Sequence, residues 1–379
     1  MQTWDVAIVG AGMAGASLAW ELTRAGVSVL LLERESQPGT HSTGRSAALF
    51  IETYGTEAIR ALTRASRAFY ETPPAGFADT PILTPRGVAY VATSDEQTEL
   101  AALRAELQPH APDLQALDRE ALLGLLPCLR PEVVAEGLLD PGAADIDVHA
   151  LHQGYLRGLR QQGGTLRCDS EVLGLRREDD RWLLQLPQGA TVAARRVVNA
   201  AGAWADVLAQ RAGAAPVGLV PKRRTAFTFP VPAGMDATHW PAAIGVAEDW
   251  YFKPDAGQLL GSPANADPVQ PHDVVAEELD VAMAIARIEE VSLLTIRRPT
   301  HTWAGLRSFV ADGEFVIGEA DALEGFFWLA AQGGYGIQSA AGYALLARNL
   351  LLGEPLDERL RAQGITPAMA TRLAPARFR

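Results

Sequence analysis

The chain has 379 residues, of which 48% are hydrophobic, and its 33 basic and 45 acidic side chains leave a formal net charge of −12. This length and apolar fraction predict a sizeable core and two domains, and the negative charge disfavours nucleic acid as a partner. Cys128 and Cys168 form neither a disulfide framework nor a metal site, and we expect no bound metal. We expect no signal peptide, no transmembrane segment and a cytoplasmic location, with peripheral contact to the inner membrane left open.

The first forty residues predict a nucleotide-binding βαβ unit. An apolar run over 5–9 leads into a G-x-G-x-x-G motif, a helix is predicted from Met13 to Ala25, and a second apolar run over 27–32 follows. Glu33 ends this run, 18 residues after the last motif glycine, where an acid can bind a ribose hydroxyl. The motif residues are Gly10, Ala11, Gly12, Met13, Ala14 and Gly15.

Each glycine of the motif has a separate physical role. Gly10 permits the tight turn, Gly12 lets a pyrophosphate approach the backbone, and Gly15 allows close packing of helix on strand. The helix that follows directs free N–H groups and a partial positive charge at the phosphates. The order of strand, glycine turn, helix, strand and acid therefore favours a dinucleotide site over a glycine-rich turn without a ligand.

A polar loop over residues 37–48 replaces the next βα unit of a simple nicotinamide-binding domain. Its small and hydroxyl-bearing residues indicate backbone wrapped closely around a ligand, because the loop directly follows the nucleotide-binding strand. An ordinary surface loop is the alternative.

The middle of the chain predicts an alternation of helices and strands. Helices are expected over 56–72, 96–107, 118–126 and 147–162, the last with Asp147 as its N-cap. Strands are expected over 87–92, 166–176, 182–186, 191–194 and 196–200, the last running into the small residues 201–203. An open parallel sheet presents its ligand at such carboxyl ends of strands.

Residues 221–310 have a different pattern, with strand-like segments over 225–229, 250–252 and 293–297 and one helix over 276–291. After them, a strand over 325–330, a glycine turn over 331–336 and a helix over 337–352 return to the first pattern. The prediction is an α/β chain, α+β overall, in which an antiparallel-sheet domain is inserted into a discontinuous Rossmann-like domain. The Rossmann-like pieces are 1–85, 141–220 and 307–379, and the inserted pieces are 86–140 and 221–306.

Several long strings resemble the flavin-dependent D-amino acid oxidase and dehydrogenase superfamily, and within it the D-arginine dehydrogenases. The resemblance extends to about residue 340. The strings are HSTGRSAA (41–48), DIDVHALHQGYLRGLR (145–160), PKRR (221–224), LLGSPANADP (259–268), HTWAGLRSFVADG (301–313) and QGGYGIQ (332–338).

The resemblance implies FAD as the dinucleotide, so that the Rossmann-like domain binds FAD and the inserted domain binds substrate. It places Glu33 on the adenosine ribose and the backbone of Val172 on the adenine. The turn over 333–338 would direct a helix N-terminus at the flavin pyrimidine edge, which gains negative charge on reduction. The implied cofactor-binding residues are Gly10, Gly12, Met13, Ala14, Gly15, Glu33, Arg34, Ser42, Thr43, Gly44, Arg45, Ser46, Ala47, Ala48, Val172, Ala201, Gly202, Trp204, Arg307, Gly333, Gly334, Tyr335, Gly336, Ile337 and Gln338.

The resemblance also implies a site that holds the carboxylate of an α-amino acid. Arg224 and Arg307 match the family's carboxylate-binding arginines, and a planar guanidinium suits two oxygens at once. From the residues alone, both would be interpreted as surface arginines. Tyr54 and Tyr251 match tyrosines near the carboxylate, and Gln338 would lie near the flavin. In this family the flavin takes a hydride from the α-carbon.

Two positions depart from the D-arginine dehydrogenases, which have histidine in place of Leu49 and glutamate in place of Val88. Without that glutamate, a cationic substrate side chain has no charge partner at this position. Loss of such a partner typically costs about 2–5 kcal/mol of binding free energy in a desolvated pocket. With Leu49, Val88 and Gly334 as substrate-pocket residues, we expect a preference for neutral, apolar D-amino acids. Glu52 or Glu248 could supply the missing acid.

The expected reaction is the oxidation of a D-amino acid to an imino acid, which hydrolyses to a 2-oxo acid and ammonia. Oxidation of glycine, sarcosine or another secondary amine, or of a 2-hydroxy acid, would use the same arginines. A flavoprotein without catalytic activity is a remoter alternative, because one fold hosts many functions. The electron acceptor, a quinone or oxygen, remains open.

Overall fold

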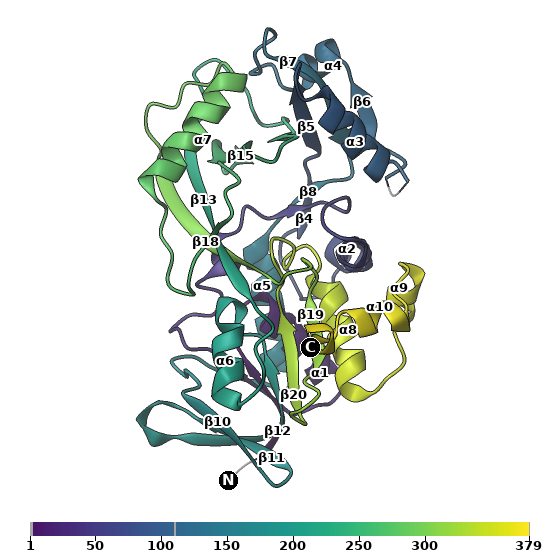
Figure 1. The fold of residues 1–379 in the computed structure, drawn as a ribbon, viewed down its shortest axis with the longest axis vertical. Coiled ribbons are helices and arrows are strands. Elements are labelled where there is room, and N and C mark those ends of the chain that lie inside the picture. The colour runs from purple at the N-terminus through teal and green to yellow at the C-terminus, as the bar shows by residue number, and fades with distance from the viewer. Residues whose placement is uncertain (1–2, 110, 379) are drawn as a thin grey trace.

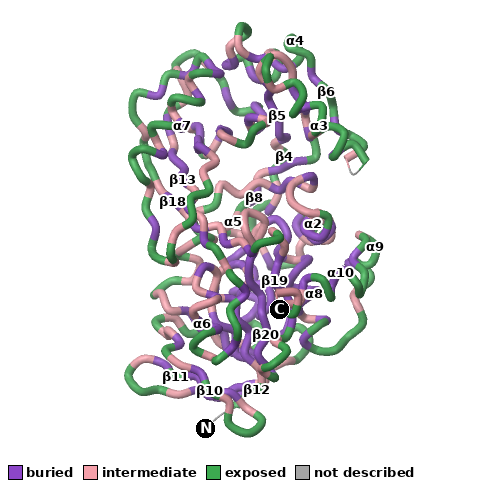
Figure 2. The backbone as a smooth tube through the Cα atoms, in the orientation of Figure 1, coloured by how far each residue is buried: buried purple, intermediate pink, exposed green. Residues whose placement is uncertain are grey.

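The computed structural model describes residues 3–109 and 111–378. Two large sheets and one small sheet organise the described chain. Figure 1 shows the two large sheets at opposite ends of an elongated molecule, with the small sheet between them. The burial view in Figure 2 shows continuous buried backbone through the lower part, around β12 and β20.

The first large sheet has eight strands and a parallel centre. The parallel strands lie in the order β9 (Thr165–Arg167), β2 (Val29–Leu32), β1 (Thr3–Val9), β12 (Thr191–Asn199) and β20 (Phe326–Ala330). Antiparallel strands extend the sheet beyond β12. The strand β11 (Arg181–Gln185) pairs with the first part of β12 and with β10 (Gly174–Glu178), and β19 (Val316–Glu319) pairs with β20. Val9 pairs with Leu32 and with Asn199, so three carboxyl ends meet at one edge.

Helices cover both faces of this sheet. The helices α1 (Met13–Arg24), α2 (Glu57–Glu71), α5 (Val148–Gln161) and α8 (Ala340–Leu352) form one apolar core with one face. The helix α6 (Ala205–Ala212) packs on the other face. The side chains of β1 alternate between the two cores, Ile8 in the first and Ala7 in the second, as a strand buried on both faces requires.

The second large sheet has nine strands. Its order is β17 (Asp267–Pro268), β13 (Val220–Pro230), β16 (Gln258–Ser262), β15 (Tyr251–Asp255), β14 (Ala242–Gly245), β5 (Val88–Thr93), β7 (Val134–Asp140) and β6 (Gln115–Leu117), and β18 (His301–Phe309) also pairs with β13. All pairs are antiparallel except β14 with β5. The helices of this part are α3 (Gln97–Leu107), α4 (Arg119–Leu125) and α7 (Glu278–Val291).

A three-stranded sheet connects the two halves, with β8 (Ala144–Ile146) between β3 (Leu49–Phe50) and β4 (Leu83–Pro85). Asp145 of β8 forms ion pairs with Arg86 (2.7 Å) and with Lys253 of β15 (2.7 Å). The C-terminal helices α9 (Glu358–Ala362) and α10 (Pro367–Arg372) follow α8. Short 3-10 helices cover Ser42–Arg45, Pro187–Gly189, Gly202–Trp204 and Pro375–Phe378.

The α/β class and most predicted helices are confirmed, and the Asp147 side chain caps α5 by accepting a bond from Ala150 N (2.8 Å). The strand predicted over 293–297 is wrong, because this segment pairs with no neighbouring strand of the described chain. Its backbone N–H at Ile296 instead donates to the carboxylate Oε1 of Glu289 (2.6 Å). The strand predicted over 166–176 is two strands, and the last long helix begins at Ala340 after a run of turns. The predicted domain boundary at 306/307 lies inside β18.

Candidate active site

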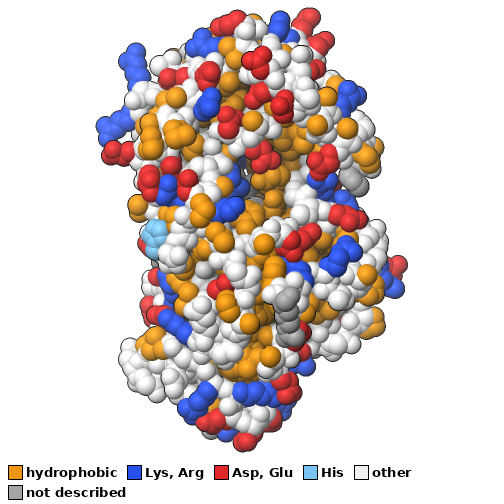
Figure 3. Space-filling view, viewed as in Figure 1, with side chains coloured by type: hydrophobic (Ala, Val, Ile, Leu, Met, Phe, Trp, Pro, Cys, Tyr) orange, Lys and Arg blue, Asp and Glu red, His pale blue; other side chains and the backbone are white. Residues whose placement is uncertain are grey.

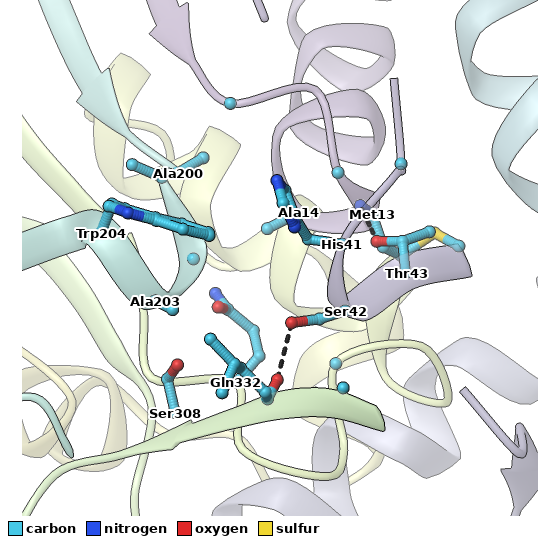
Figure 4. Close-up of a pocket in the computed structure, with 18 of the residues that line it drawn as sticks. Met13, Ala14, His41, Ser42, Thr43, Ala200, Ala203, Trp204, Ser308 and Gln332 are labelled. Atoms are coloured by element: carbon cyan, nitrogen blue, oxygen red, sulfur yellow. Dashed lines mark hydrogen bonds between the residues drawn. The ribbon is translucent and has the colours of Figure 1, made fainter. Parts of the chain in front are cut away.

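A long cavity runs from the carboxyl edge of the eight-stranded sheet to the strands β13, β15 and β18 of the second sheet. Segments far apart in sequence line it, and Figure 4 shows His41, Trp204, Ser308 and Gln332 among them. The lining includes these predicted residues: Gly10, Gly12, Met13, Ala14, Glu33, Arg34, Ser42, Thr43, Arg45, Ser46, Ala47, Val172, Ala201, Gly202, Trp204, Arg224, Tyr251, Arg307, Gly333, Gly334, Gly336 and Ile337.

The glycine motif forms one wall in a conformation that side chains would prevent. Gly10 has a φ of +104°, and a Cβ there would lie 2.3 Å from Ala200 O. A Cβ at Gly15 would lie 1.9 Å from Gly10 O, which keeps α1 close to β1 although Gly15 itself does not line the cavity. The backbone is therefore exposed to a ligand at Gly12, where the nearest atom to a Cβ is Thr43 Oγ1 at 3.2 Å.

The Glu33 carboxylate lies at the end of β2 and is 8% exposed. Its Oε2 accepts a hydrogen bond from Ala11 N (2.9 Å) and its Oε1 accepts one from Glu35 N (3.0 Å). Two backbone donors hold the carboxylate in place, and each oxygen keeps a lone pair that can accept from a ribose hydroxyl at the cavity.

The polar loop over 37–48 crosses from the first sheet to the second. Ser42 Oγ donates to Leu306 O (2.6 Å), the contact dashed in Figure 4. Arg45 donates to Val274 O (2.8 Å) and pairs with Asp273 (2.5 Å). Ala48, at the end of the loop, has a φ of +44° and does not line the cavity, nor does Gly44.

Three side chains gather at the end of the cavity next to Glu33. The Arg34 guanidinium lies 3.8 Å from the centre of the Trp204 ring, and the His41 ring lies 4.8 Å from it. His41 Nε2 also contacts Glu35 Oε1 (2.8 Å). Aromatic and guanidinium planes of this kind suit an adenine ring.

The residues present fit a bound dinucleotide. Gln332 Nε2 is buried and has no hydrogen-bond partner among the described residues, although a buried amide normally has one. Figure 4 shows the Gln332 side chain within the cavity. The glycine wall, the carboxylate of Glu33 and this free donor together match the chemistry of FAD.

The far end of the cavity carries two arginines. Arg224 on β13 and Arg307 on β18 lie on adjacent strands, since Arg224 pairs with Gly305 and Lys222 pairs with Arg307. Burial and the nearby Arg307 cation lower the pKa of Arg224 to about 10. Among the described residues, no carboxylate lies within ion-pair distance of either guanidinium.

Strand alternation separates Arg223 from Arg224. Arg223 points away from the cavity and is held by three acids, Asp280 (2.9 Å), Asp267 (3.5 Å) and Glu277. Arg224 lines the cavity together with Tyr251 of β15. The two guanidinium groups therefore lie on opposite faces of β13, that of Arg224 in the cavity and that of Arg223 among the acids.

The predicted residues Tyr54, Leu49, Val88, Tyr335 and Gln338 do not line the cavity. Tyr54 and Leu49 pack on an apolar cluster that contains Val88, and the Tyr54 ring lies 4.8 Å from that of Tyr335. The Gln338 amide is buried and bonds to Ile51 (3.1 Å) and Thr63 (3.0 Å), so its side chain is held in the interior.

The cavity also contains residues that the sequence did not single out as site residues. Gln332 could have been found, because it lies inside the glycine turn predicted over 331–336. His41 stands in the polar loop beside the predicted Ser42. Thr40 lies in the same loop, and Ala200 and Ala203 lie at the strand end predicted to face a ligand. The others come together only in the tertiary structure, and they include Ser170, Glu171, Val207, Arg211 and Ser308.

The fold and this cavity define a dinucleotide-binding protein. The family described as "FAD dependent oxidoreductase" (DAO) matches residues 5–350. The chain belongs to this family, and its cofactor is FAD.

The chain is similar in sequence to several relatives and in structure to several solved proteins. The chain is 28% identical over 211 residues to dimethylglycine dehydrogenase of Rattus norvegicus, a match that covers 55% of this chain and 24% of the relative, so it spans about a quarter of that protein. It is 24% identical over 382 residues to one subunit of the opine oxidase of Rhizobium meliloti, covering 94% and 95%. The crystal structure of glycine oxidase from Geobacillus kaustophilus superposes with a TM-score of 0.81 at 22% identity, covering 97% and 99%.

Metal-binding and membrane-spanning features are both absent from the described residues. They contain no group of histidine, cysteine and acidic side chains that could hold a metal ion. None of their helices is both long and apolar enough to cross a membrane. On the face drawn in Figure 3, basic and acidic side chains are interspersed.

Proposed function

We propose that the protein oxidises D-amino acids with neutral side chains to imino acids, which water hydrolyses to 2-oxo acids and ammonia. The observation that carries the proposal is the pair of guanidinium groups at the end of the cavity. Arg224 and Arg307 repel each other and have no carboxylate partner among the described residues. A bound substrate carboxylate would relieve this repulsion, because it places a negative charge between two cations.

Bound FAD supplies the acceptor for the hydride that leaves the substrate α-carbon. The chain supplies orientation, since a carboxylate held by two arginines leaves the α-carbon few positions relative to the cavity wall. Tyr251 of β15 lines the cavity together with Arg224, and its hydroxyl can donate a hydrogen bond to the same carboxylate.

The preference for neutral side chains rests on the apolar cluster beside this end of the cavity. Val88 is fully buried there, with Leu49, Tyr54 and Ile244 packed on the cluster. Of the two acids that could replace a charge partner, Glu52 pairs with Arg67 (2.6 Å). Glu248 is exposed in the turn after β14, with a φ of +53°, and its charge acts on Arg224 and Tyr335.

The test is anaerobic reduction of the FAD-loaded protein by single amino acids, followed by the flavin absorbance. Rapid reduction by D-leucine, D-methionine or D-phenylalanine, slow reduction by D-arginine and none by L-enantiomers are expected. Higher catalytic efficiency with D-arginine or D-lysine would contradict the neutral preference, and Glu248→Gln would then show whether Glu248 binds the cation. Readmitting air shows whether oxygen reoxidises the flavin or another acceptor, such as a quinone, is needed.

Arginine variants test the carboxylate site itself. Arg224→Met should lower kcat/KM at least about a hundredfold, because a charge-assisted bidentate contact is lost while Arg307 keeps its charge. The exposed Arg298→Gln is the matched control and should leave kcat/KM unchanged. Equal activity of Arg224→Met and wild type would exclude Arg224 as a carboxylate ligand.

Oxidation of glycine or of an N-methylated glycine is the second candidate, because the relatives include dimethylglycine dehydrogenase and a chain of sarcosine oxidase. These substrates carry the same carboxylate and would use the same arginines. Product analysis separates the candidates. Demethylation of an N-methylated glycine releases formaldehyde, whereas glycine and a primary D-amino acid both release ammonia, and glycine is distinguished by glyoxylate as its 2-oxo acid. A 2-hydroxy acid releases neither formaldehyde nor ammonia, and a flavin that no substrate reduces would favour a protein without catalytic activity.

A further inference from the structure

A polar cluster behind Arg224 joins the loop after β16 to the helix α7. Asn265 is its central residue and lies in the string LLGSPANADP. Its Nδ2 donates to Asp267 Oδ2 (2.6 Å) and to Asp280 Oδ2 (3.0 Å), and its Oδ1 accepts from Thr225 N (2.9 Å). Both amide hydrogens and one lone pair of Oδ1 are therefore used, which holds the loop rigidly against β13.

The backbone carbonyl of Asn265 accepts a hydrogen bond from Arg224 Nε (2.6 Å). This is the hydrogen bond that Arg224 makes within the described part of the chain, and it leaves the two terminal guanidinium nitrogens directed elsewhere. A neutral carbonyl orients the guanidinium without neutralising it. An acid in the same place would compete with the substrate for the arginine.

Asp280 of α7 holds the side-chain amide of Asn265 in place. It is 7% exposed and accepts from Thr225 Oγ1 (2.7 Å) and from Arg223 Nε (2.9 Å) as well as from Asn265. The acids of this cluster thus lie on the Arg223 face of β13, and the hydrogen-bond partner of Arg224 is a neutral carbonyl. Ala264, directly before Asn265, has a φ of +49°, a conformation that the surrounding contacts must maintain.

We propose that Asn265, held in place by Asp280, is a positioning residue that orients Arg224 for the substrate carboxylate. This inference rests on the proposed function in one respect, that Arg224 binds a carboxylate. Asn265 acts through its backbone carbonyl, so the effect of its side chain is indirect and passes entirely through Arg224.

The experiment measures binding of propionate to the FAD-loaded protein by the change in flavin absorbance. Asn265→Ala and Asp280→Asn should each weaken propionate binding about tenfold, and raise KM more than they lower kcat, because the loop no longer holds Arg224. FAD content should be unchanged. Glu277→Gln is the matched control, because Glu277 contacts Arg223 and does not contact Asn265, and it should bind propionate as wild type does.

A double-mutant cycle separates positioning from general destabilisation. In an Arg224→Met background, Asn265→Ala should have no further effect on propionate affinity, whereas a merely structural role would add to the loss. Unchanged binding by Asn265→Ala alone, or additive losses in the cycle, would overturn the inference and leave the proposed function intact. If the wild-type protein does not bind propionate, the assignment of Arg224 and Arg307 as a carboxylate site is wrong. That result would contradict both this inference and the proposed function.

Discussion

Gly334 packs directly against the guanidinium of Arg307. A Cβ at this position would lie 2.9 Å from Arg307 Nη1 and 3.1 Å from Cζ, although the backbone there does not require glycine. Gly334→Ala should therefore displace the guanidinium and weaken propionate binding about tenfold, with FAD retained. Gly124→Ala is the control, because a Cβ there meets nothing within 4 Å. Wild-type affinity in Gly334→Ala would mean that Arg307 does not touch the carboxylate.

The pKa of Arg224, lowered to about 10 by burial and by Arg307, predicts how carboxylate binding depends on pH. Below that pH the guanidinium is charged and binds propionate, and above it the charge is lost, so Kd should rise about tenfold per pH unit. Propionate has no amine, which removes the titration of the ligand from the result. A Kd that stays constant from about pH 8 to 11 would show that Arg224 does not titrate in this range or does not bind the ligand.

At the scale of elements, α5 supports the glycine turn through one side chain. His152 is buried, and its Nε2–H donates to Ala11 O (2.9 Å), which requires no charge on the ring. Burial lowers the pKa of His152 below 6.5. The unfolded chain therefore takes up a proton first as the pH falls, and the free energy of unfolding should decrease from about pH 6.5 downward.

The variant His152→Gln tests this support. Its melting temperature should change less between about pH 7.5 and 5.5 than that of the wild type, because the titrating group is gone while an amide donor remains. The exposed His301→Gln should keep the wild-type pH dependence. Identical pH dependence in His152→Gln and wild type would exclude His152 as the source.

At the scale of the whole molecule, Asp145 connects the three-stranded sheet to the nine-stranded sheet through Lys253 of β15, and it also pairs with Arg86 between β4 and β5. Lys253 is only 4% exposed, so its ammonium depends on acidic partners, Asp145 at 2.7 Å and Asp255 at 3.5 Å. Asp145→Asn should lower the free energy of unfolding by about 3 kcal/mol, because it leaves a buried cation without its nearer partner. Asp255→Asn should cost clearly less, and denaturant unfolding measures both. Equal losses in the two variants would contradict this role of Asp145.

Local patterns were sufficient for much of the fold. The motif Gly10 to Gly15 with its flanking apolar runs predicted β1, α1 and β2 within two residues, because turn, helix cap and strand each depend on near neighbours. The end of β2 at Glu33 and the polar loop behind it predicted one end of the cavity. The prediction of a strand over 293–297 was wrong. Its buried apolar side chains pack in the core, and the backbone N–H of Ile296 bonds to Glu289 instead of to a neighbouring strand.

The sequence by itself determined the nucleotide-binding unit and, through the strings that resemble the family, the pair Arg224 and Arg307. Each of these features depends on a short contiguous segment of the chain. The tertiary structure shows how strand alternation directs Arg224 into the cavity and why Arg223, on the other face, is surrounded by acids. It also brought Gln332 into the cavity and placed Asn265 behind Arg224. These relations depend on the pairing of β13 with β16, β17 and β18, strands that lie far apart in the chain, and no local pattern encodes which strands will meet.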